Sequence, residues 1–267
     1  KFQPDTVFNL AAESHVDNSI SNPKEFIYSN IVGTFNLLQI SKNYINKYKY
    51  NKKFKFIQVS TDEVYGSLKK NSKPFTELNK HLPNSPYSAS KSSAELLTRA
   101  WHKTYNFPSL ITNCSNNYGP WQFPEKLIPV VINKAINLKN IPVYGDGKNI
   151  RDWIFVNDHA KMLIQVAKYG LIGENYNIGA SYEITNIDLI KKICITLNIL
   201  KPSKINYLKL IKFVKDRPGH DFRYAIDSSK LNKISRIKFK ANFEKNLEMT
   251  IKWYLNNLKW LNKKFIK

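Results

Sequence analysis

The chain has little cysteine, little arginine and no long apolar run. Cys114 and Cys194 are the only two cysteines among its 267 residues, and they stand far apart. This excludes a disulfide-rich scaffold and the paired cysteine motifs of zinc and redox sites, so we expect no metal. Reduced, buried thiols favour a cytoplasmic protein. No uncharged apolar stretch reaches the roughly 18 residues of a membrane span, so we expect no membrane partner.

Positive charge is abundant, but most of it is lysine. The chain has 42 Lys and Arg against 20 Asp and Glu, a formal net charge of +22, and only five of the cations are Arg. A basic chain suggests nucleic acid as a partner, yet base readout and phosphate binding favour the arginine fork. Lys and Asn share A-rich codons, and the lysines are spread along the whole chain. We therefore favour compositional drift and expect no nucleic acid partner. The rival, a basic nucleic-acid-binding protein, would lose affinity steeply with salt.

The hydrophobic pattern alternates between strands and helices. Such repetition predicts parallel crossovers and an α/β fold with a doubly wound parallel sheet. The predicted strands are residues 5–10, 54–60, 108–114, 150–156 and 174–178. The predicted helices begin at Asn22-Pro23, Ser85-Pro86, Asn157 and Thr185, and an amphipathic helix follows at 243–258.

The loop-rich remainder predicts a second, smaller lobe packed on the sheet, where ligands of α/β proteins bind. We assign residues 1–115 to a partial dinucleotide-binding domain, with 150–180 returning to it. Residues 116–149 and 181–267 then form the lobe that binds substrate.

A tyrosine and a lysine stand one helical turn apart in Tyr87-Ser-Ala-Ser-Lys91. Residues at i and i+4 share a helix face. A nearby ammonium favours the phenolate, so we expect the pKa of Tyr87 to fall toward neutrality, which suits a general acid/base. Taken alone the spacing is weak, because a surface pair is the commoner explanation.

Two adjacent carboxylates follow the second predicted strand, in Ser60-Thr-Asp-Glu-Val-Tyr-Gly66. The carboxyl ends of strands are where α/β folds carry their chemistry. In an extended segment, consecutive side chains point to opposite faces, so Asp62 and Glu63 can address different ligand atoms. A polar turn is the alternative for this segment alone.

With both segments in view, the chain resembles the extended short-chain dehydrogenase/reductase family, and within it the dTDP-glucose 4,6-dehydratases. Tyr-x-x-x-Lys marks only the superfamily, whereas adjacent Asp-Glu after Thr61 is more specific. The resemblance implies a Rossmann-like fold, NAD as cofactor, a nucleotide-sugar substrate and a homodimer through the helices at 23–48 and 86–105. The matching stretches are 9–17, 61–66, 87–91, 113–120, 123–129, 142–147, 151–153 and 216–220.

The resemblance also implies a mechanism on the route to deoxysugars such as rhamnose. Tyr87, helped by Lys91 and Thr61, takes the C4 hydroxyl proton while NAD+ takes the C4 hydride. Glu63 removes the C5 proton, Asp62 protonates the departing C6 hydroxyl, and the hydride returns to C6. An acid in this role needs a pKa raised by burial or by a charged neighbour.

Further residues are assigned from the same resemblance, position by position. The cofactor contacts are Ala11, Ala12, Glu13, Ser29, Tyr87, Lys91 and Asn117. The substrate contacts are Ser14, Thr61, Asn116, Lys126, Leu127, Pro142, Tyr144, Arg151, Asn186, Asp216, Arg217 and His220, with Arg151 and the 216–220 segment, including Arg217, at the diphosphate. For Arg151 alone a surface ion pair is the competing interpretation. For His15, His81, His102 and His159 we expect helix-face or core positions.

A glycine-rich turn for a dinucleotide pyrophosphate is missing. None of the nine glycines forms that fingerprint. By analogy the turn belongs to βα units ahead of Asp5, so we expect residues 1–267 alone to bind NAD+ poorly. Three rivals stay open: a sister nucleotide-sugar epimerase or decarboxylase, the basic nucleic-acid binder, and an inactive remnant.

Overall fold

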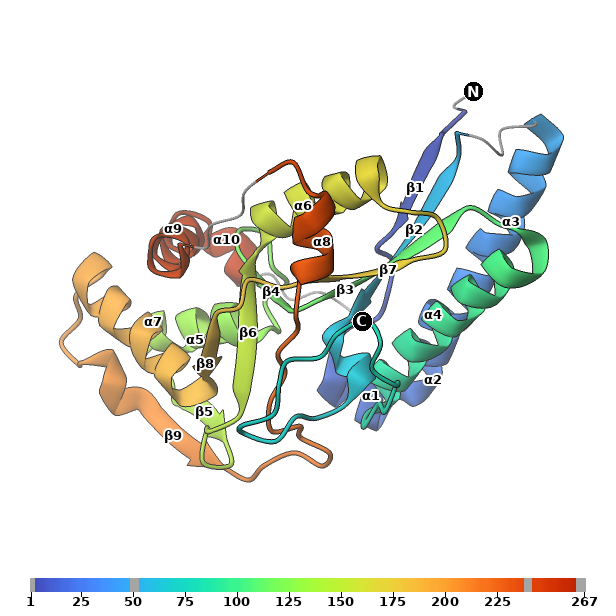
Figure 1. Cartoon of the computed structure of the whole chain (residues 1–267). Helices are drawn as coiled ribbons and strands as arrows, with labels where there is room; N and C mark the ends of the chain where they lie inside the picture. The colour runs from blue at the N-terminus through green and yellow to red at the C-terminus, as the bar shows by residue number, and fades with distance from the viewer. Residues whose placement is uncertain (1–2, 49–52, 238–241, 263–267) are drawn as a thin grey trace.

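The computed structural model describes residues 3–48, 53–237 and 242–262. Its main sheet has four parallel strands in the order β1-β2-β3-β7 (Figure 1). Each strand overlaps a predicted one, so the prediction of a parallel α/β sheet is confirmed. The strands are Thr6–Asn9 (β1), Lys55–Thr61 (β2), Ser109–Cys114 (β3) and Asn175–Ile178 (β7).

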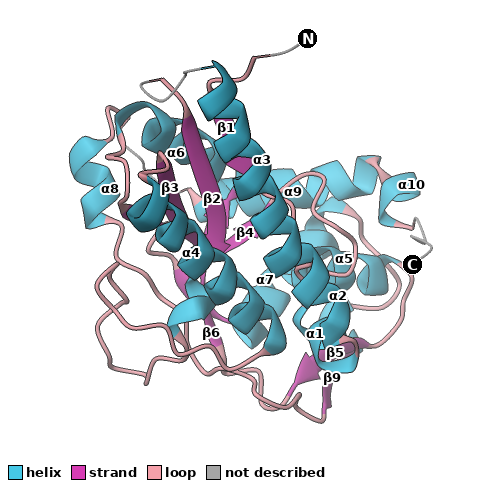
Figure 2. Cartoon of the chain, turned by 90° about the vertical axis from the view of Figure 1, so that its right-hand side faces the viewer, coloured by secondary structure: helices cyan, strands magenta, loops and turns pink. Residues whose placement is uncertain are grey.

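Helices cover both faces of this sheet, as a doubly wound fold requires. Helices α3 (Gly33–Tyr48) and α4 (Pro86–Tyr105) lie side by side on one face (Figure 2). Helices α6 (Val156–Tyr169) and α8 (Ser229–Ile234) lie on the other (Figure 1). Side chains alternate along a strand, so Phe56 packs toward α3 and α4 while its neighbour Ile57 packs toward α6 and α8.

The helix predicted from Asn22-Pro23 contains a π-helical segment. It consists of α2 (Pro23–Phe26), the π-helix η1 (Ile27–Val32) and then α3. Within η1, the buried Asn30 side chain accepts from Glu13 N (2.8 Å) and donates to Glu13 O (2.9 Å) and Ser90 Oγ (2.8 Å). We attribute the irregular turn to these tertiary bonds, which hold the loop after β1 against α4.

A second lobe packs beside the carboxyl ends of the main strands (Figure 1). Its core is a buried apolar cluster that joins two small sheets to four helices. The sheets are β4 (Asn116–Tyr118), β6 (Ile150–Phe155) and β8 (Glu183–Thr185), and β5 (Ile141–Tyr144) with β9 (Ile211–Val214). The helices are α5 (Leu127–Ile136), α7 (Asn186–Leu200), α9 (Phe243–Asn256) and α10 (Leu258–Leu261).

Two local predictions need correction. Strand β6 was expected to continue the series of main-sheet strands, but it pairs with β4 and antiparallel with β8. An apolar run predicts a buried strand without saying which sheet it joins. Asn157 was expected to cap the following helix, but Phe155 is the N-cap because α6 begins directly at the end of β6. The predicted cap of α7 is confirmed, since Thr185 Oγ1 accepts from Asp188 N (3.2 Å).

Several elements had no prediction, among them helices α5 and α8, strands β4, β8 and β9, the short helix α1 (Val16–Ser21) and the 3-10 turns η2 (Asp62–Tyr65) and η3 (Tyr207–Leu210). In the part of the chain that the structure describes, no strand pairs with the outer edge of β1. No helix there is both long and apolar enough to span a bilayer.

Candidate active site

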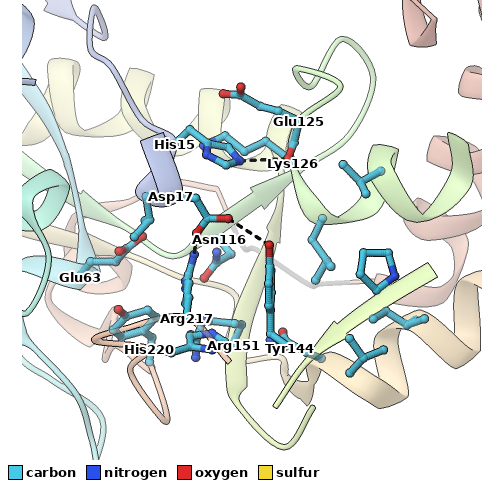
Figure 3. Close-up of a pocket in the computed structure, with 18 of the residues that line it drawn as sticks. His15, Asp17, Glu63, Asn116, Glu125, Lys126, Tyr144, Arg151, Arg217 and His220 are labelled. Carbon is cyan, nitrogen blue, oxygen red and sulfur yellow. Dashed lines mark hydrogen bonds and ion pairs between the residues drawn. The ribbon is translucent and has the colours of Figure 1, made fainter. Parts of the chain in front are cut away.

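A cavity of about 420 Å³ opens where the main sheet meets the second lobe. Side chains from both lobes point into it (Figure 3). Eleven of the residues assigned to substrate or catalysis line it: Ser14, Glu63, Asn116, Lys126, Leu127, Pro142, Tyr144, Arg151, Asn186, Arg217 and His220. The cavity therefore brings together residues that are up to 206 positions apart (220 − 14) in the sequence.

The two adjacent carboxylates lie at the end of β2, in a 3-10 turn and not in the extended segment we expected. Thr61 caps this turn: its hydroxyl accepts from Glu63 N (3.3 Å) and donates to Asp62 Oδ1 (3.3 Å). Asp62 is buried, whereas Glu63 faces the cavity. The turn thus gives the two carboxylates different surroundings.

Both carboxylates have a raised pKa. Burial, then the charges of Glu63 and Asp152, hold the pKa of Asp62 well above its usual range. Burial also raises the pKa of Glu63, although Arg151, Arg217 and Lys126 offset part of this effect. A raised pKa keeps Asp62 protonated, which is the state that a general acid needs.

Tyr87 and Lys91 lie one turn apart on α4, and both are buried. Ser85 and Ser88 form a capping box that fixes the start of this helix. The Tyr87 hydroxyl is hydrogen-bonded to Thr61. Tyr87, Thr61 and the turn that carries Asp62 and Glu63 therefore form one connected group.

The expected fall in the pKa of Tyr87 is wrong for this structure. Burial, followed by the negative charge of Glu63, raises the pKa of Tyr87 well above its usual value. The Lys91 ammonium donates to Val59 O (2.7 Å), the backbone of β2. The one-turn spacing of Tyr87 and Lys91 predicts that the two side chains share a helix face. It does not predict that a backbone carbonyl of the neighbouring strand binds the ammonium.

Arg151 is a buried residue of β6, which excludes the surface ion pair considered above. Its guanidinium donates to Ile150 O (2.7 Å) and Asp221 O (2.9 Å) and lies 4.3 Å from the ring centre of Tyr224. Backbone carbonyls and an aromatic face fix its position while leaving its charge without a carboxylate partner among these contacts. Such a cation is well placed to receive an anionic ligand.

Arg217 also lines the cavity, beside His220 and Arg151 (Figure 3). Its Nη1 lies 2.9 Å from Asp17 Oδ1, and the Tyr144 hydroxyl donates to Asp17 Oδ2 (3.3 Å). Burial favours the protonated Asp17, but Arg217 outweighs it and the pKa of Asp17 lies below its usual range. His220 Nδ1 lies 2.6 Å from Asp216 Oδ1, so Asp216 orients a cavity-lining ring without lining the cavity itself.

Comparison with known proteins identifies the family. A profile of the family described as GDP-mannose 4,6 dehydratase matches residues 1–250. The chain belongs to this family. It is also 50% identical over 266 residues to the dTDP-glucose 4,6-dehydratase of Neisseria meningitidis serogroup B. The alignment covers 97% of this chain and 75% of that protein.

Other relatives support the same family assignment. The dTDP-glucose 4,6-dehydratase of Haemophilus influenzae is 51% identical over 263 residues, covering 96% of this chain and 78% of the relative. The crystal structure of the dTDP-glucose 4,6-dehydratase DesIV from Streptomyces venezuelae, with NAD and TYD bound, superposes with a TM-score of 0.87. It shares 38% identity and covers 96% of this chain and 74% of its own.

Several cavity residues of this dehydratase were missed by sequence reasoning. His15 was expected at a helix face or in the core, but it lines the cavity, with Nε2 3.3 Å from Glu125 O, and caps α1. The sequence signal that could have placed His15 in the cavity was its position within the matching stretch 9–17. For Asp17 and Tyr224 the signal was weak, because the arginines that they contact, Arg217 and Arg151, lie far away in the sequence. His81, His102 and His159 lie away from the cavity.

The residues assigned to the cofactor lie at the carboxyl edge of the main sheet. Ala11, Ala12 and Glu13 follow β1, and Asn30 fixes the backbone of Glu13. Asn117 follows β3 and donates to Cys114 Sγ (3.3 Å) and Ser115 O (3.0 Å). Ser29 is exposed on η1. Residues 11–13 and Ser29, which are largely exposed, stay the predicted contacts of the nicotinamide half of NAD, together with the buried Tyr87 and Lys91. None of the nine glycines supplies a turn for its pyrophosphate.

The first prediction of this arrangement concerns the diphosphate. Replacing Arg217 with Gln should weaken binding of dTDP at least about tenfold, because one charge-assisted contact to a phosphate is lost. The loss should shrink at high salt. Isothermal titration calorimetry measures both. Arg236→Gln is the matched control, since Arg236 is exposed and lies outside the cavity; equal losses in the two variants would contradict the assignment.

Proposed function

We propose that the protein is an NAD-dependent hydro-lyase that converts dTDP-glucose to dTDP-4-keto-6-deoxyglucose, a step of deoxysugar biosynthesis. The observation that carries this proposal is the adjacent pair Asp62-Glu63, one buried and one facing a cation-lined cavity, beside Tyr87 and Lys91. The roughly 50% identity to dTDP-glucose 4,6-dehydratases supports the same substrate.

Three of these side chains have a direct role in the proposed reaction. Tyr87 is assigned to receive the proton of the C4 hydroxyl, a step that needs its phenolate form; the hydrogen bond to Thr61 favours that form, whereas burial opposes it. When bound, NAD+ supplies the acceptor that takes the C4 hydride and later returns it to C6. Glu63 faces the cavity and takes the C5 proton, which the C4 ketone has acidified. Asp62, held protonated by burial, gives a proton to the C6 hydroxyl so that it leaves as water.

The nucleotide half of the substrate fits the second lobe. Pro142 and Tyr144 of β5 are assigned to the base, with Asn186 nearby at the start of α7. Arg151 and Arg217 are assigned to the diphosphate. Lys126 Nζ donates to Ser14 O (2.5 Å), so these two residues bridge the lobes beside the sugar. The division into residues 1–115 with 150–180, and 116–149 with 181–267, stays a prediction.

We also infer a cytoplasmic homodimer. Apolar side chains are exposed on the η1–α3 segment and on α4, among them Tyr28, Phe35, Ile40 and Leu96. An apolar surface on adjacent helices supports a dimer through this face. Cys114 and Cys194 are both free, which supports a reducing compartment.

A product assay tests the proposed function. Incubated with NAD+ and either dTDP-glucose or UDP-glucose, the enzyme should form a 4-keto-6-deoxy sugar from the dTDP-sugar at the higher kcat/KM, as followed by proton NMR. An epimerised or decarboxylated product, or a preference for the UDP-sugar, would favour a sister enzyme instead.

A further inference from the structure

A buried carboxylate lies directly behind the Tyr87–Lys91 pair. Glu95 stands one further turn along the same face of α4 and is 1% exposed. The Asn113 side chain on β3 donates to Glu95 Oε1 (2.7 Å) and also to Thr61 O (3.2 Å). One amide therefore joins Glu95 to the strand end that begins the Asp62–Glu63 turn. Glu95 does not line the cavity.

His81 completes the surroundings of this carboxylate. Its Nε2 lies 3.4 Å from Glu95 Oε2, and its Nδ1 lies 2.8 Å from Ser92 Oγ. When the Ser92 hydroxyl donates to Nδ1, the ring proton on Nε2 faces Glu95. The His81 ring also meets the edge of Tyr65, the last residue of η2, with centroids 5.7 Å apart. Glu95 is thus tied, directly or through one side chain, to α4, β2, β3 and η2.

The nearby positive charge of Lys91 favours the ionised form of Glu95. The Lys91 ammonium is buried, and Glu95 raises its pKa against the lowering effect of burial. In turn, burial raises the pKa of Glu95 to about 7, while Asn113, Ser60 and Lys91 act against that rise. The titratable groups around Glu95 are Lys91 on its own helix, His81 from the loop before α4, and Tyr65 on η2.

We propose that Glu95 is a positioning residue for oxidation at C4: its ionised carboxylate, one helical turn from Lys91, favours the ammonium form of that side chain and, through Asn113, keeps the Thr61 strand end in register with α4. The proposal rests on the proposed function, because the roles of Tyr87, Lys91 and Thr61 come from it.

The decisive variant is Glu95→Gln. Glutamine keeps the shape and an oxygen that accepts from Asn113, but it removes the buried charge. We expect kcat to fall at least about tenfold with KM unchanged, and Tm at about pH 8 to rise by at least about 2 °C. A carboxyl whose pKa is raised on folding, here from 4.5 to about 7, makes the native state less stable as pH rises between these values. The gain in Tm should therefore be small near pH 5 and should grow up to about pH 8.

A purely structural role predicts the opposite pattern. Glu95→Gln would then lower Tm and kcat together, or leave both unchanged, and either result overturns the proposal. A second variant covers misfolding: Glu95→Asp keeps the charge and loses a methylene. We expect Glu95→Asp to retain at least about fivefold more kcat than Glu95→Gln, whereas a packing role would favour the isosteric glutamine.

Glu77→Gln is the matched control. Glu77 is partly buried, and its Oε1 accepts a hydrogen bond from Asn177 N (2.8 Å), but it lies on the loop before α4 and does not bond to Asn113 or His81. We expect unchanged kcat for this variant. The Tm measurements need no substrate, so they test the buried charge of Glu95 even if the wild type makes no product from dTDP-glucose. Absence of that product would contradict the proposed function, but not the buried charge.

Discussion

In Glu63→Gln, exchange of the C5 proton with solvent should fall at least about a hundredfold, while oxidation at C4 continues. Glu63 faces the cavity from the end of β2, and the positive charges of Arg151, Arg217 and Lys126 favour its ionised form. A ketone-activated carbon acid needs such a carboxylate base. The amide keeps the shape but cannot accept the proton. Proton NMR in deuterium oxide measures the exchange, and absorbance of the reduced cofactor measures the oxidation.

Glu125→Gln is the control for this prediction, because Glu125 lines the same cavity from the segment before α5. The control should exchange the C5 proton at close to the wild-type rate. If Glu63→Gln instead exchanges normally and only binds substrate more weakly, the base lies elsewhere and Glu63 is a substrate contact.

Tyr87→Phe should lower turnover at least about a hundredfold, because the C4 hydroxyl then has no group to receive its proton. The cofactor should stay oxidised in this variant, whereas Asp62→Asn and Glu63→Gln should allow its reduction. Steady-state kinetics and absorbance of the reduced cofactor separate these outcomes.

Tyr65→Phe is the matched control for the loss of a buried hydroxyl. The Tyr65 hydroxyl donates to Asn177 Oδ1 (3.0 Å), away from the cavity. Its removal should cost about 1 kcal/mol of stability and little turnover. Near wild-type turnover in Tyr87→Phe would show that another group performs the oxidation step.

The main sheet was predictable because its strands are short apolar runs with turn signals between them. Phe56 and Ile57 illustrate the point: both are apolar, and a sheet covered on two faces buries both. The irregular turn at η1 was not predictable, because it depends on bonds from Asn30 to Glu13 and Ser90, which are distant in sequence. Strand β6 was predicted as a strand, but the sheet that it joins was not, because that pairing also depends on residues distant in sequence.

The arrangement of the candidate active site was predictable where one segment carries the proposed chemistry, and less so where the cavity is assembled from several segments. Thr61, Asp62, Glu63, Tyr87 and Lys91 lie in two short motifs, and the structure brings these motifs together. Asp17 and Arg217 form an ion pair across 200 positions, which no local pattern contains. The predicted fall in the pKa of Tyr87 was wrong because burial, the largest effect on this group, raises the pKa. Burial is a property of the folded chain and of no local sequence pattern.

The most direct test of the central claim uses dTDP-glucose that carries deuterium at C4. The proposed mechanism moves the C4 hydride to C6 within one active site, so the product should be a 4-keto-6-deoxy sugar with that deuterium in its C6 methyl group. In deuterium oxide with unlabelled substrate, solvent deuterium should enter at C5. Loss of the C4 label to solvent, or its retention at C4 in an epimerised sugar, would contradict the account.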